Sequence, residues 1–163
     1  PQPYNKFIIP CQLMVHAIDL LEVSAIGTDQ NFHNYYMDWQ TKINWQGTVI
    51  TRRKNLTTPQ NLRDLRGTLP RVKNGGWHFS WMGGVDRVVK KMTSTVEANE
   101  LANADSSLID KTNMEKIITT GKRFWISDND PAQMMIPCDI STINLPYIQE
   151  FVRKYPQFLR PKD

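Results

Sequence analysis

The chain has 163 residues, of which 40% are hydrophobic and 22% are charged, and its formal net charge is +4. This length supports one domain with its own core and is short for two, so residues 1–163 are expected to form a single domain. No apolar run reaches the roughly 18 residues of a membrane-spanning helix, and we expect a soluble chain without a transmembrane segment.

The N-terminal third carries patterns for a helix and two strands. Apolar residues at helical spacing predict a helix, or a helix followed by a strand, over residues 11–26. Aromatic and β-branched residues predict strands over residues 32–39 and 47–53, on either side of a turn at residues 42–44.

A short helix is predicted next, because Thr58 is a good N-cap residue and Pro59 suits the first helical position. Its end is expected at Gly67. Arg63 and Arg66 are three residues apart and would share one face of this helix. A guanidinium can bind phosphate oxygens with two parallel hydrogen bonds, whereas a solvated face with ion pairs is the alternative.

Residues 74–84, with the sequence NGGWHFSWMGG, place a predicted strand between two glycine pairs. Alternation in a strand assigns its side chains to two faces. One face holds Trp77, Phe79 and Trp81 and is expected to be core, and the other holds His78, Ser80 and Met82. Gly75-Gly76 and Gly83-Gly84 would let the backbone bend or approach a ligand, and a buried strand between two turns is the alternative.

The remaining patterns predict three helices and one more strand. Val85 and later apolar residues at helical spacing predict a helix over residues 85–97. Thr112-x-x-Glu115 is a capping-box pattern for a helix ending at Gly121, and residues 123–126 are predicted as a strand. A last helix is expected from Asn144-x-Pro146 to the residue before Pro156. This mixture of elements indicates an α/β domain with a mixed sheet.

Several motifs together resemble glycosyltransferase family 17, whose members include the β-1,4-mannosyl-glycoprotein 4-β-N-acetylglucosaminyltransferases. The main resemblance lies in GGWHFSWMGG. The other matching elements, in family order, are Tyr35-Tyr36, Trp45-x-Gly47-Thr48, Leu62-Arg63-x-x-Arg66, Ile117-x-x-x-Gly121 and Leu145-Pro146-x-Ile148. The resemblance runs from about Tyr35 to Phe158.

The resemblance implies a GT-A-like, Rossmann-like transferase fold. It also implies transfer of N-acetylglucosamine, or a similar sugar, from a UDP-sugar donor to a glycan acceptor with inversion, assisted by Mn²⁺ or Mg²⁺. The expected location is the cytoplasm for a bacterial or viral protein and the Golgi lumen for a eukaryotic one.

Site residues are assigned from the resemblance and from the chemistry of their side chains. His78 is the candidate metal or phosphate ligand, and Glu97 and Glu100 are candidate catalytic bases. This sequence lacks the His-x-Glu-like segment that the family carries after the GGWH helix. The candidate substrate-binding residues are Gly75, Gly76, Trp77, His78, Ser80, Trp81, Arg63 and Arg66.

The family's metal-binding Asp-x-Asp motif precedes the GGWH region, whereas Asp128-Asn129-Asp130 comes after it in a turn-rich loop. Asp128 and Asp130 are therefore interpreted as turn residues. The opening Pro1-Gln2-Pro3 resembles the segment directly after the family's acidic motif, so the chain is expected to lack the donor-binding strands and to transfer sugar poorly alone.

Two other functions stay open, and both bear on which partners to expect. A noncatalytic carbohydrate-binding module would keep the tryptophan surface without the metal site. A basic nucleic-acid-binding domain is suggested by the charge and by Tyr35, Tyr36 and Trp39, although the basic residues are scattered and no nucleic-acid partner is expected. Cys11 and Cys138 are expected to be thiols, with a single disulfide bridge as the alternative.

Overall fold

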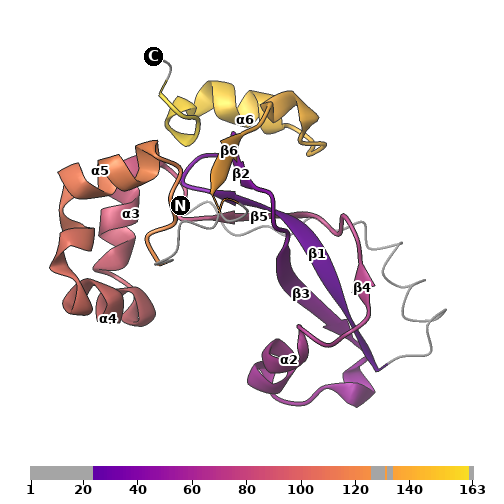
Figure 1. Cartoon of the computed structure of the whole chain (residues 1–163). Helices are drawn as coiled ribbons and strands as arrows, with labels where there is room; N and C mark the ends of the chain where they lie inside the picture. Colours follow the sequence, from indigo (N-terminus) through magenta and orange to yellow (C-terminus); the bar gives the residue numbers. More distant parts are fainter. Residues whose placement is uncertain (1–23, 126–130, 132–133, 162–163) are drawn as a thin grey trace. The chain divides into compact units, whose positions relative to one another are not determined.

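The computed structural model describes residues 24–125, 131 and 134–161, and these form a mixed α/β structure. They contain a mostly antiparallel six-stranded sheet in which β1 (Ala25–Asn34) pairs with four other strands. The other strands are β2 (Trp39–Thr41), β3 (Trp45–Thr51), β4 (Arg71–Val72), β5 (Trp77–Ser80) and β6 (Met135–Pro137). The helices of the described part are α2 (Pro59–Leu65), α3 (Gly84–Met92), α4 (Val96–Ala104), α5 (Lys111–Thr119) and α6 (Ile148–Lys154) (Figure 1).

The long strand β1 organises the sheet because several strands pair along its length. It pairs antiparallel with β3 and β2 and parallel with β4, and β5 also pairs with it. The strand β6 extends the sheet by pairing antiparallel with β2. The β1–β3 register shifts between Gly27 and Asp29.

Two compact units divide the chain, and each is described by itself. Unit 1 comprises Pro1–Phe32 and Asn44–His78, and unit 2 comprises His33–Ile43 and Phe79–Asp163. The strands β1 and β5 contribute residues to both units.

In unit 1, buried polar side chains connect β1 to β3. Thr28 and Gln30 are buried although both are polar. The amide nitrogen of Gln30 donates to Thr48 Oγ1 at 3.1 Å, and the Thr28 hydroxyl lies 3.4 Å from the Thr48 carbonyl oxygen. These bonds offset part of the cost of removing the polar groups from water.

Unit 2 contains the larger apolar core. The helices α3, α4 and α5 pack with the short 3₁₀ helix Ser106–Ile109 into one helical group (Figure 1). The buried residues of this apolar core are Tyr35, Tyr36, Trp39, Val88, Met92, Ala102, Leu108, Met114, Ile118 and Met135. The helix α6 packs against the 3₁₀ helices Ile140–Thr142 and Pro156–Phe158. Within the described ranges, no helix has both the length and the apolar character to cross a bilayer.

The predicted short helix is confirmed, since α2 follows Thr58, whose side chain accepts from the Asn61 amide at 3.1 Å. The predicted helix over residues 85–97 is wrong in extent. It ends at Met92, and α4 begins separately at Val96. The hydroxyl of Thr93 donates to the Lys90 carbonyl at 3.0 Å, a side-chain to backbone bond that competes with continuation of the helix.

Other boundaries also need correction. Residues 123–125 are not a strand, and Asp110 rather than Thr112 caps α5, accepting from the Asn113 amide at 2.7 Å. Asp is at least as good an N-cap residue as Thr. The last helix begins only at Ile148 and ends before Pro156 as predicted.

The strand predictions for the N-terminal third are confirmed in part. Ala25 and Ile26 belong to β1, and residues 11–23 lie outside the described residues. The strand predicted over residues 32–39 is interrupted, because β1 ends at Asn34 and Tyr35 has a φ of 66°. The strand predicted over residues 47–53 corresponds to β3, which begins earlier, at Trp45, and ends at Thr51, and Arg53 instead starts a 3₁₀ helix.

Candidate functional site

Three segments of unit 1 meet at the indole ring of Trp45, and we call Trp45, Arg66 and His78 the Trp45 cluster. The guanidinium carbon of Arg66 lies 5.3 Å from the ring centre, which is a cation–π contact. The His78 ring stacks on Trp45 with centroids 4.8 Å apart and planes at 17°. Phe32 lies 5.4 Å from Trp45 and 5.1 Å from His78.

The position of Arg66 depends on the end of α2. Arg66 is the C-cap residue of this helix. Its carbonyl oxygen accepts from Arg71 Nη2 at 2.9 Å, and the Gly67 carbonyl accepts from the same nitrogen at 2.9 Å. Arg71 Nη1 also pairs with Asp29 of β1 at 3.2 Å. The side chain of Arg71 therefore ties the end of α2 to β1 and holds the backbone that carries Arg66.

His78 is half-buried in β5, on the face where the sequence places a ligand. Its ring contacts are with Trp45 and Phe32. The predicted alternation continues only to Ser80, because Trp81 has a φ of 54° and lies beyond the strand. The division into an apolar face and a ligand face is therefore wrong at Trp81.

The first glycine pair brings the backbone close to β1. Gly75 is buried, and its amide donates to the Asp29 carbonyl at 2.8 Å. A Cβ at Gly75 would lie 2.6 Å from the Thr28 Cβ, closer than real Cβ atoms approach. The Gly76 carbonyl accepts from the Asn31 amide at 2.9 Å, and its φ is 128°. A close approach of two backbones requires Gly75 here, whatever else the loop contacts.

The second glycine pair, in unit 2, also contacts the protein's own backbone. Gly83 and Gly84 have φ values of 100° and 77°. Their amides donate to the Tyr35 carbonyl oxygen at 2.9 and 3.4 Å. The first amides of α3 are thus directed at a buried backbone group of this chain.

Trp81 belongs to unit 2 and forms an aromatic cluster there. Its ring centroid is 4.7 Å from Phe124 and 6.2 Å from Trp125. The ammonium nitrogen of Lys91 lies 4.3 Å from the Trp81 centroid. Burial lowers the pKa of Lys91. Arg123 lies over Trp125 at 4.6 Å.

The remaining predicted residues are spread over both units. Glu97 and Glu100 lie in α4, where Glu100 is exposed and the side chain of Glu97 is outside the described part. Arg63 is exposed on α2. Trp77 and Ser80 are half-buried in β5, and the Ser80 carbonyl accepts from the Tyr35 amide at 3.2 Å.

The sequence gives one metal hypothesis, at His78, and the described residues supply no ligand set for it. Among residues 24–125, 131 and 134–161, no group of three or more His, Cys, Asp or Glu side chains is placed to hold a metal ion. Asp128 and Asp130 lie outside these ranges.

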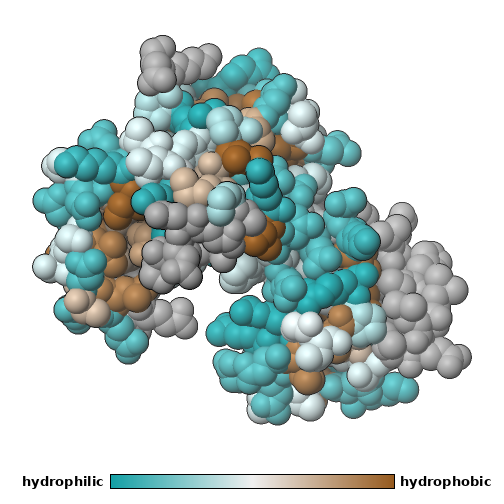
Figure 2. Space-filling view, viewed as in Figure 1, coloured by the Kyte–Doolittle hydropathy of each residue, from teal (hydrophilic) through white to brown (hydrophobic). Residues whose placement is uncertain are grey.

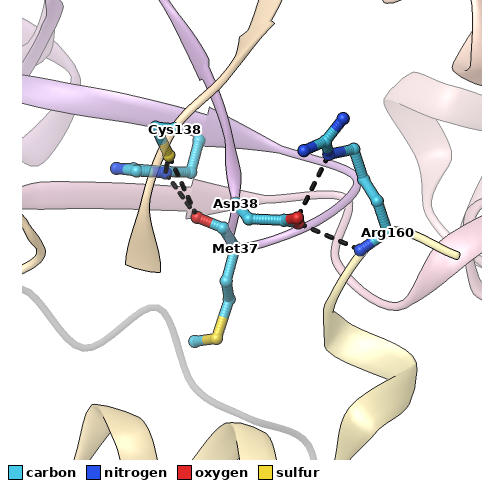
Figure 3. A network of polar contacts seen from close by, with 5 residues as sticks. Met37, Asp38, Cys138 and Arg160 are labelled. Atoms are coloured by element: carbon cyan, nitrogen blue, oxygen red, sulfur yellow. Dashed lines mark hydrogen bonds and ion pairs between the residues drawn. The ribbon is translucent and has the colours of Figure 1, made fainter. Parts of the chain in front are cut away.

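One polar cluster of unit 2 was not predicted at all (Figure 3). The carbonyl oxygen of Met37 accepts from His33 Nδ1 at 2.8 Å, and Cys138 Sγ lies 3.8 Å from the same oxygen. Asp38 accepts from the backbone and side chain of Arg160 at 3.0 and 3.1 Å. Figure 3 shows Cys138 and Arg160 approaching Met37 and Asp38 from opposite sides.

The electrostatics of this cluster favour a structural role. Burial lowers the pKa of His33 to about 4, and burial together with the charge of Asp38 raises the pKa of the Cys138 thiol to about 11. At neutral pH the imidazole is uncharged and the thiol keeps its proton, so neither group has the charge state of a Cys–His nucleophile pair. His33 and Cys138 are 105 residues apart, which explains why no local pattern indicated them.

Comparisons with known proteins add no family assignment. No protein-family model matches the chain, and searches of curated proteins and of solved structures returned no match.

Proposed function

We propose that the chain functions as a glycosyltransferase of the family 17 type, with a GT-A-like fold. It would transfer N-acetylglucosamine, or a similar sugar, from a UDP-sugar to a glycan acceptor. The acceptor hydroxyl oxygen would form the new bond to the anomeric carbon with inversion as the bond to the UDP oxygen breaks. A carboxylate would take the hydroxyl proton, and Glu97 and Glu100 are the candidates that the sequence offers.

The observation that carries this proposal is the composition of the Trp45 cluster. Trp45, Arg66 and His78 come from three of the separate motifs that resemble family 17, and they meet at one ring. The rings offer faces for stacking a sugar or a uracil base, and the guanidinium offers donors for phosphate oxygens. Polar groups beside half-buried aromatic rings are typical of sites that orient small ligands.

Metal chemistry has no assigned place in this proposal. His78 stacks on Trp45 and lies at a tilt against Phe32, and the described residues supply no set of ligands with which it would hold Mn²⁺ or Mg²⁺. We therefore assign to this chain's residues only binding, orientation and proton transfer.

The proposal is tested by measuring UDP-N-acetylglucosamine binding by titration calorimetry, with and without Mn²⁺. We expect saturable binding that Arg66→Gln weakens by about tenfold, the loss of one charge-assisted contact. Arg87→Gln is the matched control, because Arg87 lies over Phe158 at the same 5.3 Å but in unit 2. It should bind as the unaltered chain does.

A transfer assay with radiolabelled UDP-N-acetylglucosamine and an N-glycan acceptor completes the test. Label in the glycan product would support transfer, and its loss in both Glu97→Gln and Glu100→Gln variants would implicate α4. Absence of saturable donor binding would overturn the proposal. If a glycan binds in a Trp45-dependent manner and neither UDP nor Mn²⁺ affects it, the chain is instead a carbohydrate-binding module.

A further inference from the structure

Residues 52–66, which we call the basic segment, are one of several stretches of this chain that carry an excess of positive charge. The basic segment contains five Arg or Lys residues and one Asp, a formal charge of +4. The whole chain also has a formal charge of +4, so the rest of the sequence is neutral overall. Local concentration of charge creates a surface potential that the modest total would not suggest.

The basic segment is attached to the sheet at its start. It contains the 3₁₀ helix Arg53–Asn55, which directly follows β3, and then α2. The Asn55 side chain donates to the Ser24 carbonyl at 3.1 Å, and the Thr51 hydroxyl donates to the same oxygen at 2.7 Å. Arg53 and Lys54 therefore project from an anchored turn.

Four of the five cations of the basic segment lie at the surface. Arg52, Arg53, Lys54 and Arg63 are all exposed. Within the described part of the chain, neither Arg53 nor Lys54 forms an ion pair. Asp64, the only acid of the segment, accepts from the Gln60 side chain at 2.7 Å. Arg53 and Lys54 are thus available to an anionic partner.

Large apolar side chains are exposed in the same segment. Leu56 is 58% exposed and Leu65 is 48% exposed. Figure 2 shows hydrophobic surface at α2 within surroundings that are mainly hydrophilic. The segment contains no aromatic residue. Exposed leucines contribute little to binding the phosphate backbone of a nucleic acid. Their burial in a lipid interface, in contrast, is favourable.

We propose that the basic segment docks on the surface of an anionic lipid bilayer. Clusters of four to eight Lys and Arg residues are typical of contacts with acidic headgroups, and the segment has five. Leu56 and Leu65 would enter the boundary between headgroups and acyl chains while the cations stay at the headgroup phosphates and carboxylates. Peripheral docking of this kind needs no spanning helix.

Vesicle co-sedimentation of the full chain tests this proposal. We expect binding to vesicles with roughly one-third phosphatidylserine and none to pure phosphatidylcholine at about 0.1 M salt, with release at about 1 M salt, where screening is strong. Arg53→Gln with Lys54→Gln should weaken partitioning by roughly tenfold or more, because each cation contributes separately. Leu56→Ala with Leu65→Ala should weaken it by a similar factor.

Lys90→Gln with Lys116→Gln is the matched control, because it removes the same number of lysine or arginine charges from unit 2. It should bind vesicles as the unaltered chain does. Absence of binding to acidic vesicles, or equal loss in the control, would overturn the proposal. So would salt-sensitive binding to a single-stranded oligonucleotide that the leucine variant leaves unchanged, which would indicate a nucleic-acid partner. No sugar ligand is involved, so this outcome is independent of the donor-binding test.

Discussion

Units 1 and 2 both bury polar side chains, but they bury very different numbers of apolar ones. In unit 2, α3 and α5 enclose Val88, Met92 and Met114, which are fully buried. In the described part of unit 1 the buried apolar residues are Ala25, Ile26 and Phe32, and the Trp45 ring is only half-buried. We therefore expect apolar packing in unit 2 to supply most of the stability.

The largest expected effect comes from removing apolar volume in unit 2. Met114→Ala should lower the free energy of unfolding by about 2–5 kcal/mol, because a fully buried side chain leaves a cavity. Leu65→Ala in unit 1 is the control and should change it by less than about 0.5 kcal/mol, since Leu65 is exposed. Urea denaturation followed by circular dichroism measures both. Equal losses would contradict the comparison.

The second effect is a pH dependence that originates in unit 2. The folded-state pKa of His33 is about 4 against 6.5 for the free side chain, because burial outweighs the hydrogen bond to Met37 and the charge of Asp38. Below pH 6.5 the unfolded chain therefore binds a proton that the folded chain does not. This contribution to stability is present above pH 6.5 and is lost progressively as the pH falls toward 4, by about 3 kcal/mol in all.

Unfolding free energies measured between pH 7 and pH 4 check this prediction, with His33→Gln as the comparison. The variant lacks the titrating ring, so its stability should fall less steeply over this range than that of the unaltered chain. Parallel curves for the two proteins would show that His33 does not titrate as expected. Asp38 and Cys138 are present in both proteins, so the difference between the two stability curves reports on His33.

The third expected effect concerns the close approach of Gly75 to β1 in unit 1. Gly75→Ala should cost about 1–3 kcal/mol, because the new Cβ would meet Thr28 of β1 at 2.6 Å. Gly67→Ala is the control, since its nearest atom, Gln46 Oε1, is 4.0 Å away. It should be neutral or stabilise by up to about 1 kcal/mol. A Gly75→Ala variant of full stability would leave ligand approach as the reason for glycine here.

Sequence patterns succeeded where the signal is local. Thr58 and Pro59 predicted the start of α2, and the glycine-flanked strand is β5, because capping and turn preferences act over a few residues. The break after Met92 was missed because apolar spacing continues to Val96 while hydroxyl residues between them bind the last carbonyls of α3.

The composition of the Trp45 cluster could not be predicted, although its members all lie in motifs that resemble family 17. Its formation depends on pairing of β1 with β3, β4 and β5, and sequence spacing says nothing about which strands pair. The contact of Asp38 with Arg160 spans 122 residues and is equally invisible to local patterns. Long-range contacts therefore decide which of the candidate residues meet.

The smallest expected effect is the difference in stability lost when one partner is removed from each of two ion pairs in unit 2. The Arg160–Asp38 pair is partly buried, with side chains 31% and 16% exposed, and the Arg160 amide also donates to Asp38. The Lys111–Asp86 pair has side chains 68% and 79% exposed. Arg160→Gln should cost about 1–2 kcal/mol of unfolding free energy, since it leaves a carboxylate short of a partner and removes a contact with Trp39. Lys111→Gln should cost less than about 0.5 kcal/mol, because solvent screens an exposed pair.

Urea denaturation in low and high salt distinguishes the two ion pairs. If the loss for Arg160→Gln disappears in high salt, the partly buried pair behaves as a surface pair, and unit 2 depends on its apolar core alone.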